Sequence, residues 1–151
     1  MIQRIQSLYL LAVAILSSIT LFLPWASFID TYSIYYNFSY EGLLGKAEYL
    51  ALNTWVLTVV AAIVPILALI SIFLYKKRIL QIRFCRVNLL LSAAFYALFA
   101  VYFYMIAKMG MKTLNISIIL VFPLINMIFT YLAIRAIRKD EDLVRSVSRL
   151  R

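Results

Sequence analysis

Few side chains in this 151-residue sequence could carry out chemistry. There is no histidine and only one cysteine, Cys85, so the usual metal ligand, the usual proton carrier at neutral pH and any internal disulfide are missing. No glycine-rich motif for a nucleotide is present. The six carboxylates lie outside the long apolar stretches, whereas proton pumps and voltage sensors place charges inside them. The sequence therefore predicts a non-enzymatic protein without a metal or cofactor.

One polar pair inside an apolar stretch could contact a ligand. Asn126 and Thr130 follow Pro123 at successive intervals of three and four residues, roughly on one side of a helix. Proline removes a backbone donor, which predicts a bend and a freed carbonyl at Ile119. The pair could bind an ion or small ligand, or it could join helices through hydrogen bonds worth about 0.6 kcal/mol on average. We expect the second role for Asn126 and Thr130.

Four uncharged stretches must position these side chains, and 66% of all residues are hydrophobic. Each stretch can cross the hydrocarbon core, which takes about 20 helical residues. Backbone groups in lipid must be satisfied within the segment, so stretches of this length are helices. The first is too long for the apolar part of a signal peptide, and we expect it to remain. The prediction is an all-α membrane protein, a single-domain four-transmembrane-helix bundle. The spans are residues 5–29, 49–75, 87–107 and 113–134.

The positive charges predict the orientation of this bundle. Three lysines, Lys46, Lys108 and Lys112, fall in the outer segments, and the other twelve of the 15 basic residues fall on the opposite side. This positive-inside bias predicts that both termini are cytoplasmic. The net charge of +9 then reflects topology and attraction to anionic headgroups, and we expect no nucleic-acid partner.

Two basic segments face the cytoplasm in this topology. One is the loop of residues 76–86, and the other is the tail of residues 135–151. The tail spaces its apolar residues as a helix does, which predicts an amphipathic helix that lies on lipid or docks on a soluble partner. The basic residues predicted to make such contacts are Lys76, Lys77, Arg78, Arg138 and Arg145.

The outer segment between the first two spans alternates aromatic or apolar residues with polar ones. Period two predicts a strand over residues 31–41 with one buried face. A lone strand is unstable, so it should pair with residues 43–48, pair with another protein, or lie on the bilayer surface. Its aromatic face is interpreted either as a headgroup-level belt or as an edge that binds a partner. The residues predicted to make these contacts are Tyr32, Tyr36, Phe38 and Tyr40, beside Ile34.

The third stretch has a small face and an aromatic face. Ala93, Ala97 and Ala100 share one side at helical spacing. Small residues allow close helix approach in lipid, so we expect this face to pack against another helix. The aromatic face is expected to contact lipid or helices. It comprises Phe95, Phe99, Tyr102 and Phe103.

The first ten residues, Met-Ile-Gln-Arg-Ile-Gln-Ser-Leu-Tyr-Leu, precede an apolar run that ends in Leu23-Pro24-Trp25. This opening resembles that of an uncharacterised bacterial family of small four-span membrane proteins, known only as a domain of unknown function. The resemblance implies a bacterial cytoplasmic (inner) membrane and brings no activity with it.

Two functions remain open for such a chain. The first is an accessory or structural subunit that packs against other membrane proteins through the outer strand, the basic loop and the tail. The alternative is a small transporter or channel formed by oligomers, with Asn126 and Thr130 lining its path. The expected partners are the lipid bilayer and either other membrane proteins or further copies of this chain.

Overall fold

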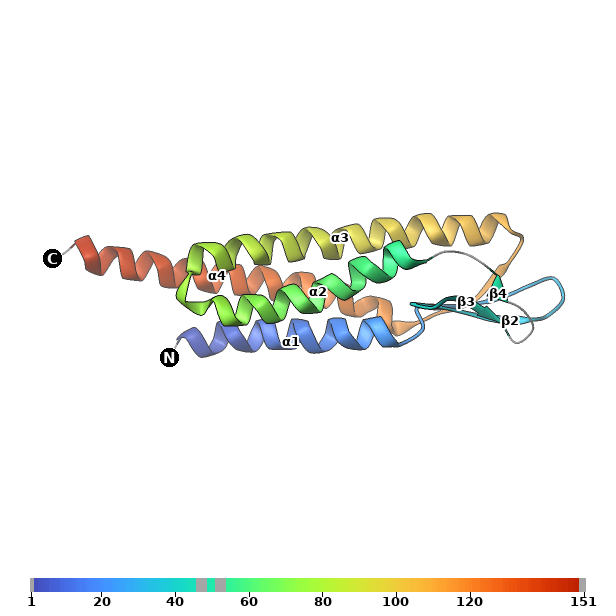
Figure 1. Cartoon of the computed structure of the whole chain (residues 1–151), viewed down its shortest axis with the longest axis horizontal. Helices are drawn as coiled ribbons and strands as arrows, with labels where there is room; N and C mark the ends of the chain where they lie inside the picture. The colour runs from blue at the N-terminus through green and yellow to red at the C-terminus, as the bar shows by residue number, and fades with distance from the viewer. Residues whose placement is uncertain (1, 46–48, 51–53, 150–151) are drawn as a thin grey trace.

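Four long helices run side by side in the computed structural model of the chain, and a small sheet stands at one end of them (Figure 1). The structure describes residues 2–45, 49–50 and 54–149. The helices are α1 (Ile2–Phe22), α2 (Trp55–Phe73), α3 (Arg78–Lys108) and α4 (Phe122–Arg149), with short 3-10 helices η1 (Leu74–Lys76) and η2 (Ile118–Val121). Each long helix contains an apolar segment that is long enough to cross a membrane. The predicted helical bundle with an extended outer element is confirmed.

The helices pack as a ring. α1 packs against α2 and α4, and α3 packs against the same two helices. Both termini lie at the end of the bundle away from the sheet (Figure 1). α3 is the longest helix, with 31 residues, or about 46 Å at the usual helical rise. Its C-terminal part continues alongside the sheet, so α3 is the element on which the sheet rests (Figure 1).

The sheet has five antiparallel strands in the order β4-β3-β2-β1-β5. They are β1 (Ala26–Ile29), β2 (Tyr35–Ser39), β3 (Gly42–Gly45), β4 (Tyr49–Leu50) and β5 (Lys112–Ile116). The strand predicted from the alternating pattern is β2, and it pairs with β1 on one side and β3 on the other. Of the alternatives left open for this segment, pairing within the chain is the one that the structure shows. The strand is shorter than the predicted residues 31–41, because a turn precedes Tyr35.

The first and fourth predicted spans include strands. α1 ends at Phe22, because Pro24 removes a backbone donor and disfavours helical geometry in the residue before it. At the other span, β5 precedes η2, and α4 begins at Phe122. Pro123 therefore lies in the first turn of α4, where no donor is needed. The carbonyl of Ile119 accepts the N–H of Phe122, so the predicted bend with a freed carbonyl was wrong.

Other predicted boundaries also shift. Residues 78–86 form the first turns of α3, so the basic loop shrinks to η1 and Lys77. The second predicted span begins in β4, and its helix starts only at Trp55. The predicted tail helix is a direct continuation of α4, which runs to Arg149. Residues 150–151 lie outside the described residues.

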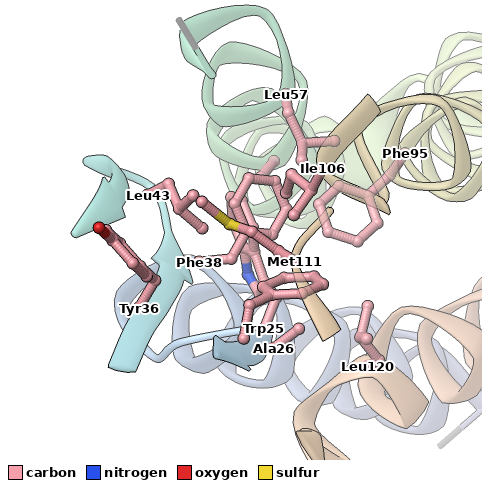
Figure 2. Packing of buried hydrophobic residues seen from close by; sticks show 12 residues of the cluster. Trp25, Ala26, Tyr36, Phe38, Leu43, Leu57, Phe95, Ile106, Met111 and Leu120 are labelled. Carbon is pink, nitrogen blue, oxygen red and sulfur yellow. The ribbon is translucent and has the colours of Figure 1, made fainter. Parts of the chain in front are cut away.

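An aromatic core joins the sheet to the bundle (Figure 2). The indole N–H of Trp25 donates a hydrogen bond to the carbonyl of Thr20, 2.7 Å away, which fixes the ring at the end of α1. The Trp25 ring meets Phe38 of β2 edge to face at 5.4 Å and Phe95 of α3 at 5.6 Å. Such pairs add about 0.5–1.5 kcal/mol beyond the area they bury. The sheet is therefore held rigidly on the end of the bundle.

The two faces of α3 are the reverse of the prediction. Ala93, Ala97 and Ala100 are exposed, so they do not pack against another helix of this chain. The aromatic face is the one that packs inward, with Phe95 buried and its neighbours against the sheet. The physical reason is that the aromatic side chains bury far more apolar area, and a five-stranded sheet is large enough to cover them. The single strand predicted from the sequence would have been too small to cover them.

Candidate functional site

The hairpin between β1 and β2 presents one predicted contact residue to solvent. Asp30 accepts hydrogen bonds from the backbone N–H of Thr31 at 2.7 Å and from its hydroxyl at 3.0 Å. Ser33 adopts a φ of 62°, and its N–H donates to the carbonyl of Asp30. This tight turn holds Tyr32 outward, with 83% of its surface exposed.

The other predicted contacts on this segment differ in exposure. Tyr36 and Phe38 are buried in the chain's own core, so neither can reach lipid or a partner. Tyr40 is partly exposed, and its hydroxyl donates to the carboxylate of Glu41 at 2.7 Å. This hydrogen bond, together with the negative charge of Glu41, raises the pKa of the Tyr40 phenol. Of the predicted aromatic face, Tyr32 and Tyr40 remain available for contact.

The sheet has an open edge at β5. In the described part of the chain, β1 is the only strand that pairs with β5. All five β5 residues are exposed, including the apolar Leu114 at 53% and Ile116 at 57%. Natural edge strands usually carry charges or bulges that weaken pairing, and β5 carries both, the charge of Lys112 and a register shift opposite Ser27 and Phe28 of β1 that leaves Leu114 without a cross-strand partner there. This edge offers backbone groups and apolar side chains to an added strand.

A polar cluster lies inside the bundle. Asn126 and Thr130 are both buried on α4, and Asn88 of α3 is buried as well. Within the described residues, no hydrogen-bond partner meets the Asn126 Oδ1, the Thr130 hydroxyl or either amide atom of Asn88. The Asn126 carboxamide was predicted to hydrogen-bond a neighbouring helix, and its oxygen accepts no such hydrogen bond from the described residues. These atoms are uncompensated polar groups in an apolar interior.

Asn126 also lines a small cavity between α1, α2, α3 and α4. Its volume is about 20 Å³, while roughly 10–15 Å³ by this measure holds one water. The hydroxyls around it, Ser17, Thr20 and Ser92, each donate to a carbonyl of their own helix. Across the described residues, no group of three or more acidic, histidine or cysteine side chains could hold a metal. The cavity fits a water molecule better than a transported solute.

A protein-family model described as a domain of unknown function, DUF4293, matches residues 2–150. The chain belongs to this family. Membership in DUF4293 confirms the resemblance to an uncharacterised family, and the family description assigns no activity. No curated protein and no solved structure matches the chain.

In this member of DUF4293, the end of the bundle away from the sheet is held by a buried carboxylate. Gln6 of α1 donates from its amide nitrogen to Oδ2 of Asp140 on α4 at 2.7 Å. Arg78 of α3 donates to the carbonyl of the same Asp140 at 3.1 Å. Three helices therefore meet at one residue, and Arg78, predicted as a lipid or partner contact, binds within the chain.

The other predicted basic contacts remain at this end. Lys77 and Arg138 are exposed. Lys76 belongs to η1 and Arg145 to α4, and the side chains of both lie outside the described part of the structure. Sequence reasoning missed Asn88, Gln6 and Asp140. A polar pair four residues apart in an apolar stretch, Asn88 and Ser92, was the available signal for the first of them.

Proposed function

We propose that the chain is a non-enzymatic integral protein of a bacterial cytoplasmic membrane that serves as an accessory or structural subunit of a larger membrane complex. The observation that carries this proposal is the open, exposed edge of β5 on a sheet held rigidly by the aromatic core. A rigid edge binds a partner strand without the ordering cost of a flexible loop.

In the proposed orientation the termini are cytoplasmic and the sheet is external. Twelve of the 15 basic residues belong to the segments predicted to be cytoplasmic, which supports this orientation. Thiol labelling gives the test, because the native Cys85 is buried. Tyr32→Cys should react with a membrane-impermeant maleimide in intact cells, and Lys77→Cys only after permeabilisation. Labelling in the opposite order would reverse the proposed orientation.

The expected depth of the sheet in the membrane favours pairing of the β5 edge. The apolar run 87–107 of α3 has the length of the hydrocarbon core, about 30 Å. The strand residues Phe28 and Phe38 contact Phe103 and Phe99 within that run, so we place the base of the sheet in the outer part of the bilayer. Lipid cannot satisfy backbone groups, and open sheet edges do not occur in the hydrocarbon region. A protein partner would complete β5.

Charged residues on the edge strand test this function. We expect Leu114→Lys combined with Ile116→Lys to reduce the partner that co-purifies from native membranes about tenfold or more, because lysine on an edge disfavours strand pairing. The side chains are exposed, so the thermal stability of the isolated protein should change little. The measurement is quantitative mass spectrometry after affinity purification in mild detergent.

The control is Tyr35→Lys, which places one added lysine at a similarly exposed position on β2, away from the edge, and is compared with each edge substitution made singly as well as with the pair. It should retain the partner. A photo-crosslinking residue at position 114 should give a specific adduct, and one at position 35 should not. Equal co-purification with the edge variant and the control would contradict the proposed role.

The buried polar cluster favours a second candidate, an oligomeric transporter or channel. Uncompensated groups at Asn88, Asn126 and Thr130 would be explained if another conformation brought solvent or a solute to them. The test is Asn126→Cys with small water-soluble thiol reagents. Modification from either side of sealed vesicles, in a homo-oligomer without other subunits, would favour transport over the accessory role.

A further inference from the structure

The side chains of the sheet form rows across the strands, and these rows end at β5. Residues paired between neighbouring strands point to the same face of a sheet. On the face toward α3, the register places Leu43, Phe38, Ala26 and Ile116 in one apolar row. The first three are buried, whereas Ile116 is 57% exposed. Ile116 therefore continues the core row and is exposed because, among the described strands, none lies beyond β5.

The opposite face of the sheet carries a polar row that also ends at β5. The register places Asn37, Ser27 and Asn115 side by side on β2, β1 and β5. The hydroxyl of Ser27 donates a hydrogen bond to Oδ1 of Asn37 at 3.0 Å. Asn115 is exposed and prolongs this row to the edge. A strand added beside β5 would meet a primary amide here, and its best cross-strand neighbour is another amide or a hydroxyl.

Lys112 is the only charged residue of β5, and it ends a second row on the polar face. Its cross-strand neighbours in this row, Ile29 and then Tyr35, carry no charge. The carboxylate of Asp30, next along β1, accepts two hydrogen bonds from Thr31 in the turn. The exposed ammonium of Lys112 is therefore available to an added strand, where a carboxylate is its favourable cross-strand neighbour.

The three positions differ in their distance from the helices. β5 leads into η2 and α4, so Ile116 lies toward the bundle and Lys112 toward the far end of the sheet (Figure 1). In the proposed orientation the apolar end of the edge is nearest the bilayer, and the charged end is nearest water. A carboxylate beside Lys112 would therefore remain partly hydrated and would not have to be buried.

We propose that the segment that completes β5 is an extended strand of another protein with a defined order of residues. It places an apolar residue beside Ile116, an amide or hydroxyl residue beside Asn115, and an acidic residue beside Lys112. This inference rests on the accessory function proposed above and names the chemistry of its partner. Asn115 and Lys112 pair with residues two positions apart on β1, so the polar and acidic residues should be two or three positions apart. A second copy of β5 does not fit, because β5 has no carboxylate.

Coupling without a spacer, in native membranes, tests the contact at Lys112. A carbodiimide joins an amine to a carboxylate that touches it, so we expect an amide link from Lys112 to an aspartate or glutamate of the partner. Lys112→Arg should keep the partner and lose the link, because a guanidinium keeps the charge but does not couple. Lys112→Glu should lower the recovered partner about fivefold or more, because repulsion replaces attraction.

Lys108→Glu is the matched control. Lys108 is also exposed at the outer end, but it belongs to α3, and its ammonium lies over the ring of Tyr104 at 5.2 Å. This variant should keep the partner. Both lysines are exposed, so the thermal stability of each variant should stay close to that of the unaltered chain. An equal loss of partner from both charge reversals would overturn the specific role of Lys112.

The sequence of the partner peptide joined by the photo-crosslinker at position 114 separates this inference from the proposed function. A peptide of another protein with the apolar, polar and acidic residues in the expected order supports the inference. A peptide of another protein without an acidic residue within three positions of the polar one overturns the order and leaves the accessory role standing. An adduct with a second copy of this chain overturns the inference as well. The absence of any adduct at position 114 overturns the accessory role together with it.

Discussion

Replacing Phe38 by alanine is expected to lower the free energy of unfolding by about 3–5 kcal/mol. The side chain is fully buried between the sheet and the bundle. Its ring contacts those of Trp25 just before β1, of Phe28 in β1, and of Phe99 and Tyr102 in α3. Removing it deletes apolar area and opens a void where β1, β2 and α3 meet. Denaturant or thermal unfolding of the purified protein in detergent measures the loss.

Tyr35→Ala is the control for this substitution. Tyr35 lies three residues earlier on the same strand, with its side chain exposed, so its loss should change stability by no more than about 0.5 kcal/mol. A similar effect for both variants would mean that the sheet is not fixed to the bundle through the aromatic core. The far-ultraviolet spectrum of the Phe38 variant should keep its helical signal, because the contacts among the helices do not include Phe38.

The sequence predicted the helices because lipid imposes a strict rule. Backbone groups in hydrocarbon must bond within their own segment, so an uncharged stretch of sufficient length is a helix. The same rule explains the boundary errors. Strands β1 and β5 follow or open apolar stretches without any intervening charge, so nothing in composition separates Phe28 from α1 or Leu114 from α4. Pro24 was the local signal that α1 ends.

The candidate sites were harder to predict because they depend on contacts distant in sequence. Period-two alternation identified β2, but only the pairing of β1 with β5 reveals an open edge. Gln6 and Asp140 are separated by 134 positions and meet only because α1 lies beside α4. Without knowledge of the sheet, the alanine face of α3 was predicted to pack, because small residues allow close helix approach. The aromatic residues take that place once there is a surface to cover them.

Asn88→Leu is expected to raise the free energy of unfolding by about 1–3 kcal/mol, the usual penalty for a buried polar group without a partner. Asn88 is almost completely buried on α3, and within the described residues neither its amide nitrogen nor its oxygen meets a hydrogen-bond partner. Leucine has a similar shape and no polar atom to desolvate. The measurement is the unfolding free energy of the purified protein in detergent.

Asn88→Ala separates the loss of polarity from the gain of packing. It removes the same amide but leaves a void, so it should stabilise less than leucine or not at all. Asn88→Asp should be clearly less stable than the unaltered chain at neutral pH, because it places a charge in the same apolar interior. If leucine instead destabilises by more than about 1 kcal/mol, the amide has a partner that the isolated chain does not supply, such as a bound water, a solute or a second subunit. That result in a protein purified without other subunits would favour the transport candidate, whereas a stabilised Asn88→Leu variant that keeps its partner at β5 would favour the accessory role.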